Sequence, residues 1–368
     1  MSINNFCFGV NTVLNKIKAL LSTAIGWLKN HNIYSYGFYK SQKKLKRWLA
    51  IFATSFVASV LVLSMTLSIV TDIYFGKMVS DGGNINIEVN PETDRKFEKV
   101  INIMFYGLDS RELTEQSRSD AIMLVTIDQK HNKIKMVSIA RDTRVEIPGY
   151  GKDKINHAFA YGWNKSGNIA GGAELSIKTV NSNFDLNVKN YATANFWGLA
   201  HIIDYIGGVD VDVDSAEKND INKNYIPFLQ DMGIECEPIA GTGKQHLTGG
   251  QAVAYCRVRH VGGTTARGSR HQEVLMALFE QVKKMNVTKY PELVNRVLSE
   301  CSTSLKKDDV LSLAAWAVKN VNSLEFETLS IPTAEYDRGT TINGVWYHTY
   351  DLDIATKQIH DFILEPES

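Results

Sequence analysis

The chain has 368 residues, of which 44% are hydrophobic and 22% charged, with only 7 Pro and 26 Gly. This composition excludes a disordered or fibrous protein and indicates a folded chain with a sizeable core. Acidic and basic residues are equal in number, 40 of each, but residues 1–47 hold eight basic residues and no acidic one. The remainder therefore has 32 basic against 40 acidic residues, a balance that argues against non-specific binding of nucleic acid.

Residues 48–71 are 24 consecutive positions without a charged side chain, and about 20 apolar residues suffice to span a bilayer. The basic residues Lys43, Lys44, Lys46 and Arg47 directly precede this segment. Because basic residues flank the cytoplasmic end of a membrane span, we expect a cytoplasmic tail over residues 1–47, a single transmembrane helix over residues 48–71 and an extracellular domain. A cleaved signal peptide is the alternative, but the basic region is too long for one and no small-residue cleavage site follows.

Residues 72–97 are polar and are interpreted as a linker, and residues 98–368 as one extracytoplasmic domain. Runs rich in Ile, Val and Met predict strands at residues 100–106, 121–127 and 135–140, with a polar hairpin connection at 128–133. Further strand-like segments are 188–193, 209–213 and 324–331, and helical patterns are 173–183, 196–205, 272–284, 291–299, 309–321 and 353–364. The glycine pairs at 171–172, 207–208 and 249–250 are interpreted as turns. The pattern predicts an α/β (α+β) fold, with a central mixed β-sheet flanked by helices.

Charged residues gather at the ends of the predicted strands and apolar runs. Five clusters have this position: residues 107–111, 118–120, 141–144, 257–259 and 267–270. Arg257 and Arg259 are two apart, a spacing that puts both guanidiniums on one face of an extended chain. Arg267 and Arg270 are three apart, before a predicted helix, and would share one helical side. If the first three strands are neighbours, we expect these groups to meet at one edge of the sheet.

Arginines beside two or three aspartates are what a polyphosphate with a divalent cation requires. The guanidinium fork binds phosphate oxygens bidentately. Asp109 and Asp120 offer hard oxygen ligands for Mg²⁺, which uses one or two carboxylates together with phosphate and water. A single Arg–Asp pair is better explained as a plain ion pair in a loop, but five clusters at such positions favour a phosphate site.

Taken in order, these clusters resemble the LytR-CpsA-Psr family of bacterial cell-wall enzymes. The resemblance runs from residue 99 to residue 285, and its motifs are residues 107–111, 118–120, 138–143, 154–158, 171–173, 204–210, 247–252, 257–259 and 267–272. The order of so many motifs makes the resemblance specific, and a short cytoplasmic tail with a single anchor also fits the family.

The resemblance implies a phosphotransferase on the outer face of the membrane. Such an enzyme takes a glycopolymer, of the teichoic acid or capsular polysaccharide class, from an undecaprenyl-pyrophosphate carrier and joins it to peptidoglycan through a phosphodiester. It implies Mg²⁺ (or Mn²⁺) held by Asp109 and Asp120, and catalysis by Asp109, Asp120 and Arg141. The residues implied to bind the pyrophosphate are Arg118, Arg141, Lys154, Arg257, Arg259, Arg267, Arg270 and Gln272. The polyprenyl tail is expected in an apolar tunnel lined in part by residues 196–205 and 272–284.

The chain departs from the family's pattern at three positions. Ala140 stands where Pro is usual, Thr264 where an acidic residue is usual, and His271 where Gln is common. Without that acidic residue, the general base stays unassigned between Asp109 and Asp120. Two alternative functions would use the same site: a hydrolase of polyprenyl pyrophosphate, in which water replaces the sugar hydroxyl, and a non-catalytic lipid-binding or regulatory membrane protein.

Overall fold

A computed structural model describes residues 22, 85–108, 110 and 117–364. The chain divides into two units, residues 1–73 and 74–368, and the elements named below all belong to the second. Across the described ranges, no helix has both the length and the apolar character that crossing a membrane requires. The predicted transmembrane helix (48–71) and the predicted tail, apart from Ser22, lie outside the described residues, as do Asp109 and Arg111.

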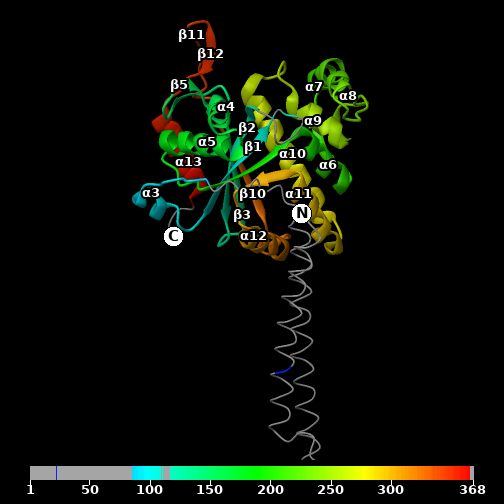
Figure 1. The fold of residues 1–368 in the computed structure, drawn as a ribbon. Coiled ribbons are helices and arrows are strands. Elements are labelled where there is room, and N and C mark those ends of the chain that lie inside the picture. Colours follow the sequence, from blue (N-terminus) through cyan, green and yellow to red (C-terminus); the bar gives the residue numbers. More distant parts are fainter. Residues whose placement is uncertain (1–21, 23–84, 109, 111–116, 365–368) are drawn as a thin grey trace, which may run out of the picture. The chain divides into compact units, whose positions relative to one another are not determined.

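A six-stranded mixed sheet forms the centre of this unit, with strand order β10-β3-β2-β1-β6-β9 (Figure 1). The strands are β1 (Ile101–Leu108), β2 (Ser119–Asp128), β3 (Lys133–Ile139), β6 (Asn190–Asn195), β9 (Cys301–Thr303) and β10 (Glu325–Ile331). β1 and β2, β2 and β3, and β6 and β9 pair antiparallel, whereas β1 and β6, and β3 and β10, pair parallel. The predicted central mixed sheet is confirmed, and the first three strands are neighbours.

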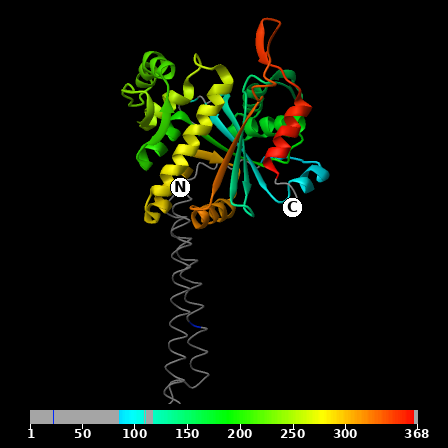
Figure 2. The same cartoon turned by 180° about the vertical axis from the view of Figure 1, so that it is seen from behind.

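Helices cover both faces of the sheet (Figures 1 and 2). On one face lie α4 (Ile155–Ser166), α5 (Ile169–Phe184) and α13 (Leu352–Ile363), and on the other α10 (Gly263–Lys284), α11 (Tyr290–Ser299) and α12 (Lys307–Asn320). Successive side chains of a strand point to opposite faces. Met104 and Tyr106 therefore pack under α4 and α5, while Phe105 faces α10. Coverage of both faces explains why these strands are nearly continuous apolar runs in the sequence.

A second hydrophobic cluster lies beside the sheet. Its elements are α6 (Phe196–Ile206), β7 (Val209–Val213), α7 (Ser215–Asp220), a π-helical segment (Ile221–Tyr225), α8 (Ile226–Asp231), β8 (Gly243–Leu247) and α9 (Gly249–Arg257). Val274 of α10 belongs to this cluster, and the same helix also faces the sheet. α10 therefore packs against both this cluster and the sheet.

Two interpretations of the sequence are corrected. α10 begins at Gly263 rather than at residue 272, because the arginines of its first turns, which have high helix propensity, are part of the helix rather than of a preceding loop. The glycine pair 171–172 lies inside α5 and the pair 249–250 begins α9. A Cβ at Gly171 would lie 2.0 Å from Ser166 Oγ of α4, and one at Gly172 would lie 2.8 Å from the Phe159 ring of α4. Glycine is needed at these two positions for contact between α4 and α5, not for a turn.

The residues predicted as a linker also contain ordered structure in their described part. α3 (Pro91–Lys96) begins at the N-cap Asn90, whose side chain accepts a hydrogen bond from the Glu92 backbone N–H. Phe97 is fully buried, and Ile85 and Ile87 pack against the core. The packed structure therefore starts before residue 98.

Candidate functional site

Asp120 is the extra residue of a β-bulge. Gly107 pairs with Ala121 and Leu108 pairs with Ser119, which leaves Asp120 without a partner residue in β1. Strict alternation would turn Asp120 to the face of Ile122, which packs in the core under α4 and α5. A bulge re-aims a side chain and is common beside active sites. Here it accounts for the contact of Asp120 with α10, on the opposite face.

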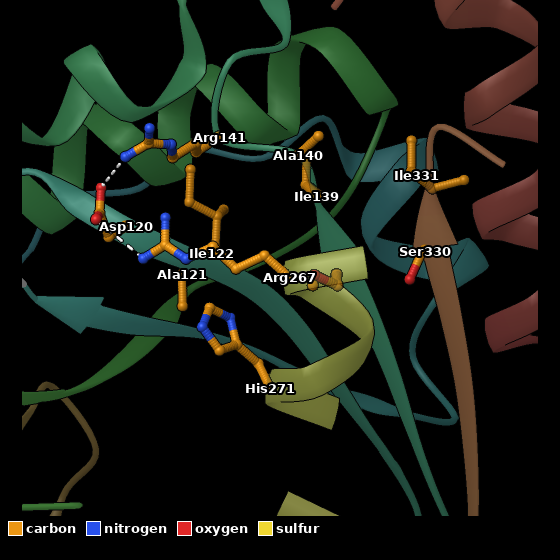
Figure 3. Close-up of a pocket in the computed structure, with 12 residues that line it drawn as sticks. Asp120, Ala121, Ile122, Ile139, Ala140, Arg141, Arg267, His271, Ser330 and Ile331 are labelled. Carbon is orange, nitrogen blue, oxygen red and sulfur yellow. Dashed lines mark hydrogen bonds and ion pairs between the residues drawn. The ribbon is translucent and has the colours of Figure 1, made fainter. Parts of the chain in front are cut away.

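Three arginines surround the carboxylate of Asp120, and Figure 3 shows two of them, Arg141 and Arg267. Arg141 Nη1 lies 2.7 Å from Oδ1, while Arg259 Nη2 and Arg267 Nη2 lie 2.6 and 3.0 Å from Oδ2. Arg141 follows β3, Arg259 follows α9 and Arg267 lies in the first turns of α10. The tertiary structure therefore brings together four elements that are up to 147 residues apart in sequence.

The charges of this cluster decide the protonation of Asp120. Burial by itself raises the pKa of Asp120, but the charges of Arg267, Arg141 and Arg259 outweigh it and hold the pKa well below its usual value. Asp120 is therefore ionised at neutral pH. Three guanidiniums against one carboxylate leave an excess of two positive charges, which is an environment for an anion.

The cluster has unused capacity to donate hydrogen bonds. Arg267 is buried, and its Nη1 has no hydrogen-bond partner among the described residues. Such an orphaned buried donor is costly unless a ligand or water completes it. The enclosed space beside it measures about 20 Å³, which is room for a water molecule rather than a phosphate. Arg259 and Arg141 keep 42% and 23% of their side chains exposed, so a larger anion has access from the solvent side.

Two further predicted residues lie at the rim of the cluster. Lys154 Nζ is 2.7 Å from Asp142 Oδ1, and Asp142 Oδ2 is 3.3 Å from Arg141 Nε. Lys154 is thus linked to Arg141 through a shared carboxylate. Arg118 is exposed, and its charge opposes the rise in the pKa of Tyr161 to about 12 that the hydrogen bond to Asp153 causes, so Arg118 lies toward α4.

Arg257, Arg270 and Gln272 contact other groups than the carboxylate of Asp120. Arg257 ends α9, and its guanidinium stacks on the rings of Phe196 and Phe228, 4.3 and 4.8 Å from their centroids. The expectation that Arg257 and Arg259 point from one face of an extended chain is therefore corrected, because the helix ends between them.

Arg270 and Gln272 hold other parts of the site in place. Arg270 Nε is 2.7 Å from Glu217 Oε1, and the same guanidinium donates to the carbonyls of Val258 and Val261. These two carbonyls flank Arg259, so Arg270 positions the loop that carries it. Gln272 Nε2 donates to the carbonyls of Met136 and Leu329 and ties α10 to β3 and β10.

His271 is a residue of the site that the sequence did not single out for a role. It lines the cavity beside Asp120, and its Nε2 is 3.0 Å from the carbonyl oxygen of Cys256. Burial, and secondly the charge of Arg267, lower the pKa of His271 to about 3, so the ring is neutral. Its spacing of four from Arg267, which places both side chains on one side of a helix, was the signal available in the sequence.

A row of apolar cavities leads away from the arginine cluster between the sheet and α10. The first, of about 50 Å³, shares Ala121 and His271 with the small cavity beside Asp120. The second, of about 400 Å³, shares Phe105 and Leu275 with the first and extends to α11 and α12. Phe196 and Leu199 of α6 and the α10 residues from Val274 to Val282 line these spaces. Residues from both ranges expected to line an apolar tunnel, 196–205 and 272–284, line these cavities.

The described residues offer one carboxylate at the centre of the cluster. No group of three or more His, Cys, Asp or Glu side chains suited to a metal occurs within the described ranges. Mg²⁺ needs only one or two protein carboxylates when phosphate supplies further oxygens. Asp120 therefore fits as one ligand of a metal–phosphate complex but does not form a metal site by itself.

Comparison with known proteins decides the family. A sequence profile of the LytR_cpsA_psr family matches residues 74–361. The polyisoprenyl-teichoic acid–peptidoglycan teichoic acid transferase TagU of Halalkalibacterium halodurans is 34% identical over 262 residues, which are 69% of this chain and 75% of TagU. The chain belongs to the LytR_cpsA_psr family.

Solved structures of LytR_cpsA_psr proteins share the fold. TagT bound to LIIa-WTA is 26% identical, with a TM-score of 0.56 over 76% of this chain and 94% of TagT. The LytR-CPS2A-psr family protein YwtF (TagT) with bound octaprenyl pyrophosphate lipid is also 26% identical, with a TM-score of 0.53 over the same shares of the two chains. The second structure shows that a member of this family accommodates a polyprenyl chain and its diphosphate.

The cluster predicts a large effect of Asp120→Asn on stability. Arg267 and Asp120 are both buried, and removing one partner of a buried ion pair costs about 3–5 kcal/mol. Because the pKa of Asp120 is lowered in the folded chain, this stabilisation is present above the ordinary aspartate pKa and is lost as pH falls through the folded value. We expect urea unfolding of full-length protein at pH 7 to show the deficit, and the two proteins to converge in acid.

The matched control is Asp210→Asn. Asp210 also has a lowered pKa, from its hydrogen bond with His246, but 35% of its side chain is exposed. Exposed pairs contribute about 1 kcal/mol or less. Equal losses of stability in the two variants would contradict the assignment of Asp120 as the centre of the cluster.

Proposed function

We propose that this protein is a phosphotransferase that moves a glycopolymer, of the teichoic acid or capsular polysaccharide class, from a polyprenyl-pyrophosphate carrier to peptidoglycan through a phosphodiester. The observation that carries the proposal is the excess of positive charge around Asp120 at one end of a row of apolar cavities. A lipid diphosphate has the matching polarity, with a charged head and a long apolar tail. The activity in the name of the related TagU supports the same reaction.

The donor binds with its diphosphate over the arginines and its polyprenyl chain in the cavities under α10. The diphosphate contacts the solvent-facing sides of Arg141 and Arg259, because the enclosed space beside Arg267 measures only about 20 Å³. Lys154 and Arg118 extend the positive surface at the rim. The cavities present almost only apolar side chains, among them Phe105, Leu275 and Phe279, and burial of apolar chain from water drives its binding.

The reaction is a substitution at phosphorus. The acceptor hydroxyl oxygen attacks the phosphorus that carries the glycopolymer, and the bond from this phosphorus to the bridging oxygen breaks. Polyprenyl phosphate leaves with the electron pair, and the hydroxyl proton passes to a base. Catalysis of such transfer consists largely of positioning and charge stabilisation, which the guanidiniums of Arg141 and Arg259 supply to the phosphate oxygens.

The sequence left two aspartates, Asp109 and Asp120, as candidates for the base that accepts this proton. A carboxylate whose pKa is held far below its usual value is a weak base, and Asp120 is in this state. His271 is also a weak base because its pKa is lowered to about 3. We therefore assign the proton to Asp109, which directly follows β1 in the sequence and lies outside the described residues.

A divalent cation, Mg²⁺ or Mn²⁺, completes the site in this proposal. Asp120 would hold it together with diphosphate oxygens, and the family resemblance implies Asp109 as a second ligand, which would then take up the proton with the carboxylate oxygen that does not hold the ion. When bound, the ion would neutralise charge that develops on the phosphates. In this structure Asp120 orients Arg141, Arg259 and Arg267.

The membrane arrangement rests on the sequence of the first unit. The uncharged stretch 48–71, preceded by Lys43, Lys44, Lys46 and Arg47, supports a single span with a cytoplasmic N-terminus. The catalytic domain then lies on the extracellular side, where both the polyprenyl-linked donor and peptidoglycan are present.

Arg259 offers the cleanest test of catalysis. We expect Arg259→Ala to lower kcat for transfer by about 10²–10³-fold, the usual loss for one donor to a developing charge. Its side chain is 42% exposed and Asp120 keeps two partners, so the fold should be retained. The measurement is transfer of a radiolabelled, lipid-linked glycopolymer to peptidoglycan by the full-length protein in detergent.

Arg95→Ala is the matched control for loss of an arginine. Arg95 is exposed on α3, where its Nε donates to the Pro91 carbonyl, and its loss should leave kcat unchanged. Full activity of Arg259→Ala would remove the assignment. A hydrolase would instead release polyprenyl phosphate at the same rate with and without added peptidoglycan, and no glycopolymer would become attached to the peptidoglycan.

Removal of divalent cations tests the metal. We expect EDTA to abolish transfer, because the arginines alone then neutralise the diphosphate charge. Added Mg²⁺ or Mn²⁺ should restore transfer. Transfer at an undiminished rate after EDTA treatment and dialysis would reject the metal requirement. It would not contradict the assignment of the arginines.

The tail cavity predicts a dependence on chain length. Ala317 of α12 lines the cavity of about 400 Å³, and Ala317→Trp would fill part of it. Each buried CH₂ contributes about 0.8 kcal/mol, so displacing a few of them should raise KM for an undecaprenyl-linked donor about tenfold or more. KM for a donor with a two-isoprene tail should not change. Ala315→Trp, at an exposed position of the same helix, is the control; equal effects of the two on both donors would count against the cavity.

A further inference from the structure

Three tyrosines lie beside one another near the arginine cluster, and we call them the aromatic platform: Tyr150, Tyr161 and Tyr347. Tyr150 directly precedes β5 (Gly151–Lys154), Tyr161 lies in α4, and Tyr347 lies in β12 (Val345–His348), which pairs with β11 (Gly339–Ile342). Tyr150 is 48% exposed, and Tyr161 and Tyr347 are partly exposed. Large aromatic rings exposed together mark interaction sites more often than isolated ones do.

The rings of the platform are held in fixed positions. Tyr150 stacks on Tyr161 with ring centroids 4.6 Å apart and an interplanar angle of 10°. Asp153 orients two of the rings, because the hydroxyl of Tyr161 donates to it at 2.6 Å and that of Tyr347 at 3.5 Å. The adjacent Trp346 points to the opposite face of β12, where it packs over Gly339, and is not part of the platform. The tyrosine rings are therefore preorganised.

The platform is continuous with the arginine site. The backbone N–H of His348, at the end of β12, donates to the carbonyl of Asp142, the residue after Arg141. Lys154 Nζ lies between the two features, 2.7 Å from Asp142 and 5.7 Å from the centroid of the Tyr347 ring. The β11–β12 hairpin bonded to the Arg141 loop thus places aromatic rings directly beside the proposed diphosphate position.

The platform and the tail cavities lie toward opposite ends of the sheet. In Figure 1 the β11–β12 hairpin stands at the top, whereas α12, which lines the largest apolar cavity, lies at the bottom. In phosphoryl transfer the attacking and leaving oxygens are roughly in line on either side of phosphorus. The leaving group carries the lipid toward α12, so the attacking hydroxyl must approach from the side of the platform.

We propose that the aromatic platform binds the glycan strand of peptidoglycan and presents its hydroxyl for attack; this inference rests on the proposed transfer function. The C–H faces of pyranose rings are apolar and flat, and they stack on aromatic faces while their hydroxyls stay in water. Tyr and Trp suit this task, because they combine a large apolar face with a polar edge and few rotatable bonds. We assign the platform to the acceptor rather than to the donor, because the attacking hydroxyl must approach phosphorus from the side opposite the leaving polyprenyl phosphate.

The test measures acceptor binding without the donor. Full-length protein in detergent is titrated with a soluble peptidoglycan tetrasaccharide, and Kd is determined for wild type, Tyr150→Ala and Tyr347→Ala. We expect each Ala variant to raise Kd about tenfold, the effect of truncating an aromatic anchor. Tyr150→Phe keeps the ring and should bind within about twofold of wild type. Neither side chain is buried, so circular dichroism should report an unchanged fold.

A second measurement separates this inference from the proposed function. In the transfer assay, the Ala variants should raise KM for the acceptor and leave KM for the lipid-linked donor unchanged. Tetrasaccharide binding that depends on Tyr150 in a protein that transfers nothing would keep the platform and reject the transferase. Absence of tetrasaccharide binding by wild type, unchanged Kd in the Ala variants, or an increase confined to the donor KM would overturn the platform as the acceptor site.

Discussion

The ionised carboxylate of Asp120, buried against three guanidiniums, is the interaction on which the rest of the site depends. It joins β2 to the loop after β3, to the loop after α9 and to the first turns of α10. A buried ion pair of this kind adds little net stability when complete, but removal of one partner is expensive. The arrangement therefore fixes where four separate elements meet. It also leaves an excess of positive charge that the chain cannot neutralise with its described residues at this position, and an anionic ligand can.

Two local features allow this meeting of charges at the end of an apolar sheet. The bulge in β2 turns Asp120 toward α10, and Gly107 lets the strands approach there, since a Cβ at Gly107 would lie 2.9 Å from that of Ala121. Gly268 serves α10 in the same way, because a Cβ there would lie 2.7 Å from Ser138 Oγ. Farther along, where α10 faces the strands with Leu275 and Phe279, the packing leaves apolar cavities. One helix thus carries both halves of the proposed lipid diphosphate site, its charged end and its apolar wall.

The proposed reaction orders these features along the sheet. The tail cavities, the arginine cluster and the aromatic platform follow one another in that order, which is the order of lipid, diphosphate and sugar in the transfer. Arg270 and Gln272 belong to this arrangement as positioning residues. Arg270 holds the carbonyls on either side of Arg259, and Gln272 ties α10 to β3 and β10. Their chemistry resembles that of ligand-binding residues, but in this structure they support the residues that face the ligand.

The sequence by itself determined the strands of the central sheet other than β9, the mixed α/β class, the family and most of the charged residues at strand ends. These follow from apolar periodicity and from the order of motifs, which are local properties of the chain. It did not reveal that α10 begins as early as Gly263, that α9 ends between Arg257 and Arg259, or that His271 faces the cavity. Arginine is compatible with both loop and helix, so its local sequence does not fix its surroundings. Only the tertiary structure decided which arginines share Asp120, because bulge, helix entry and strand order act between residues far apart in the chain. For the same reason the aromatic platform, built from three segments that are separate in sequence, could not be predicted from any one of them.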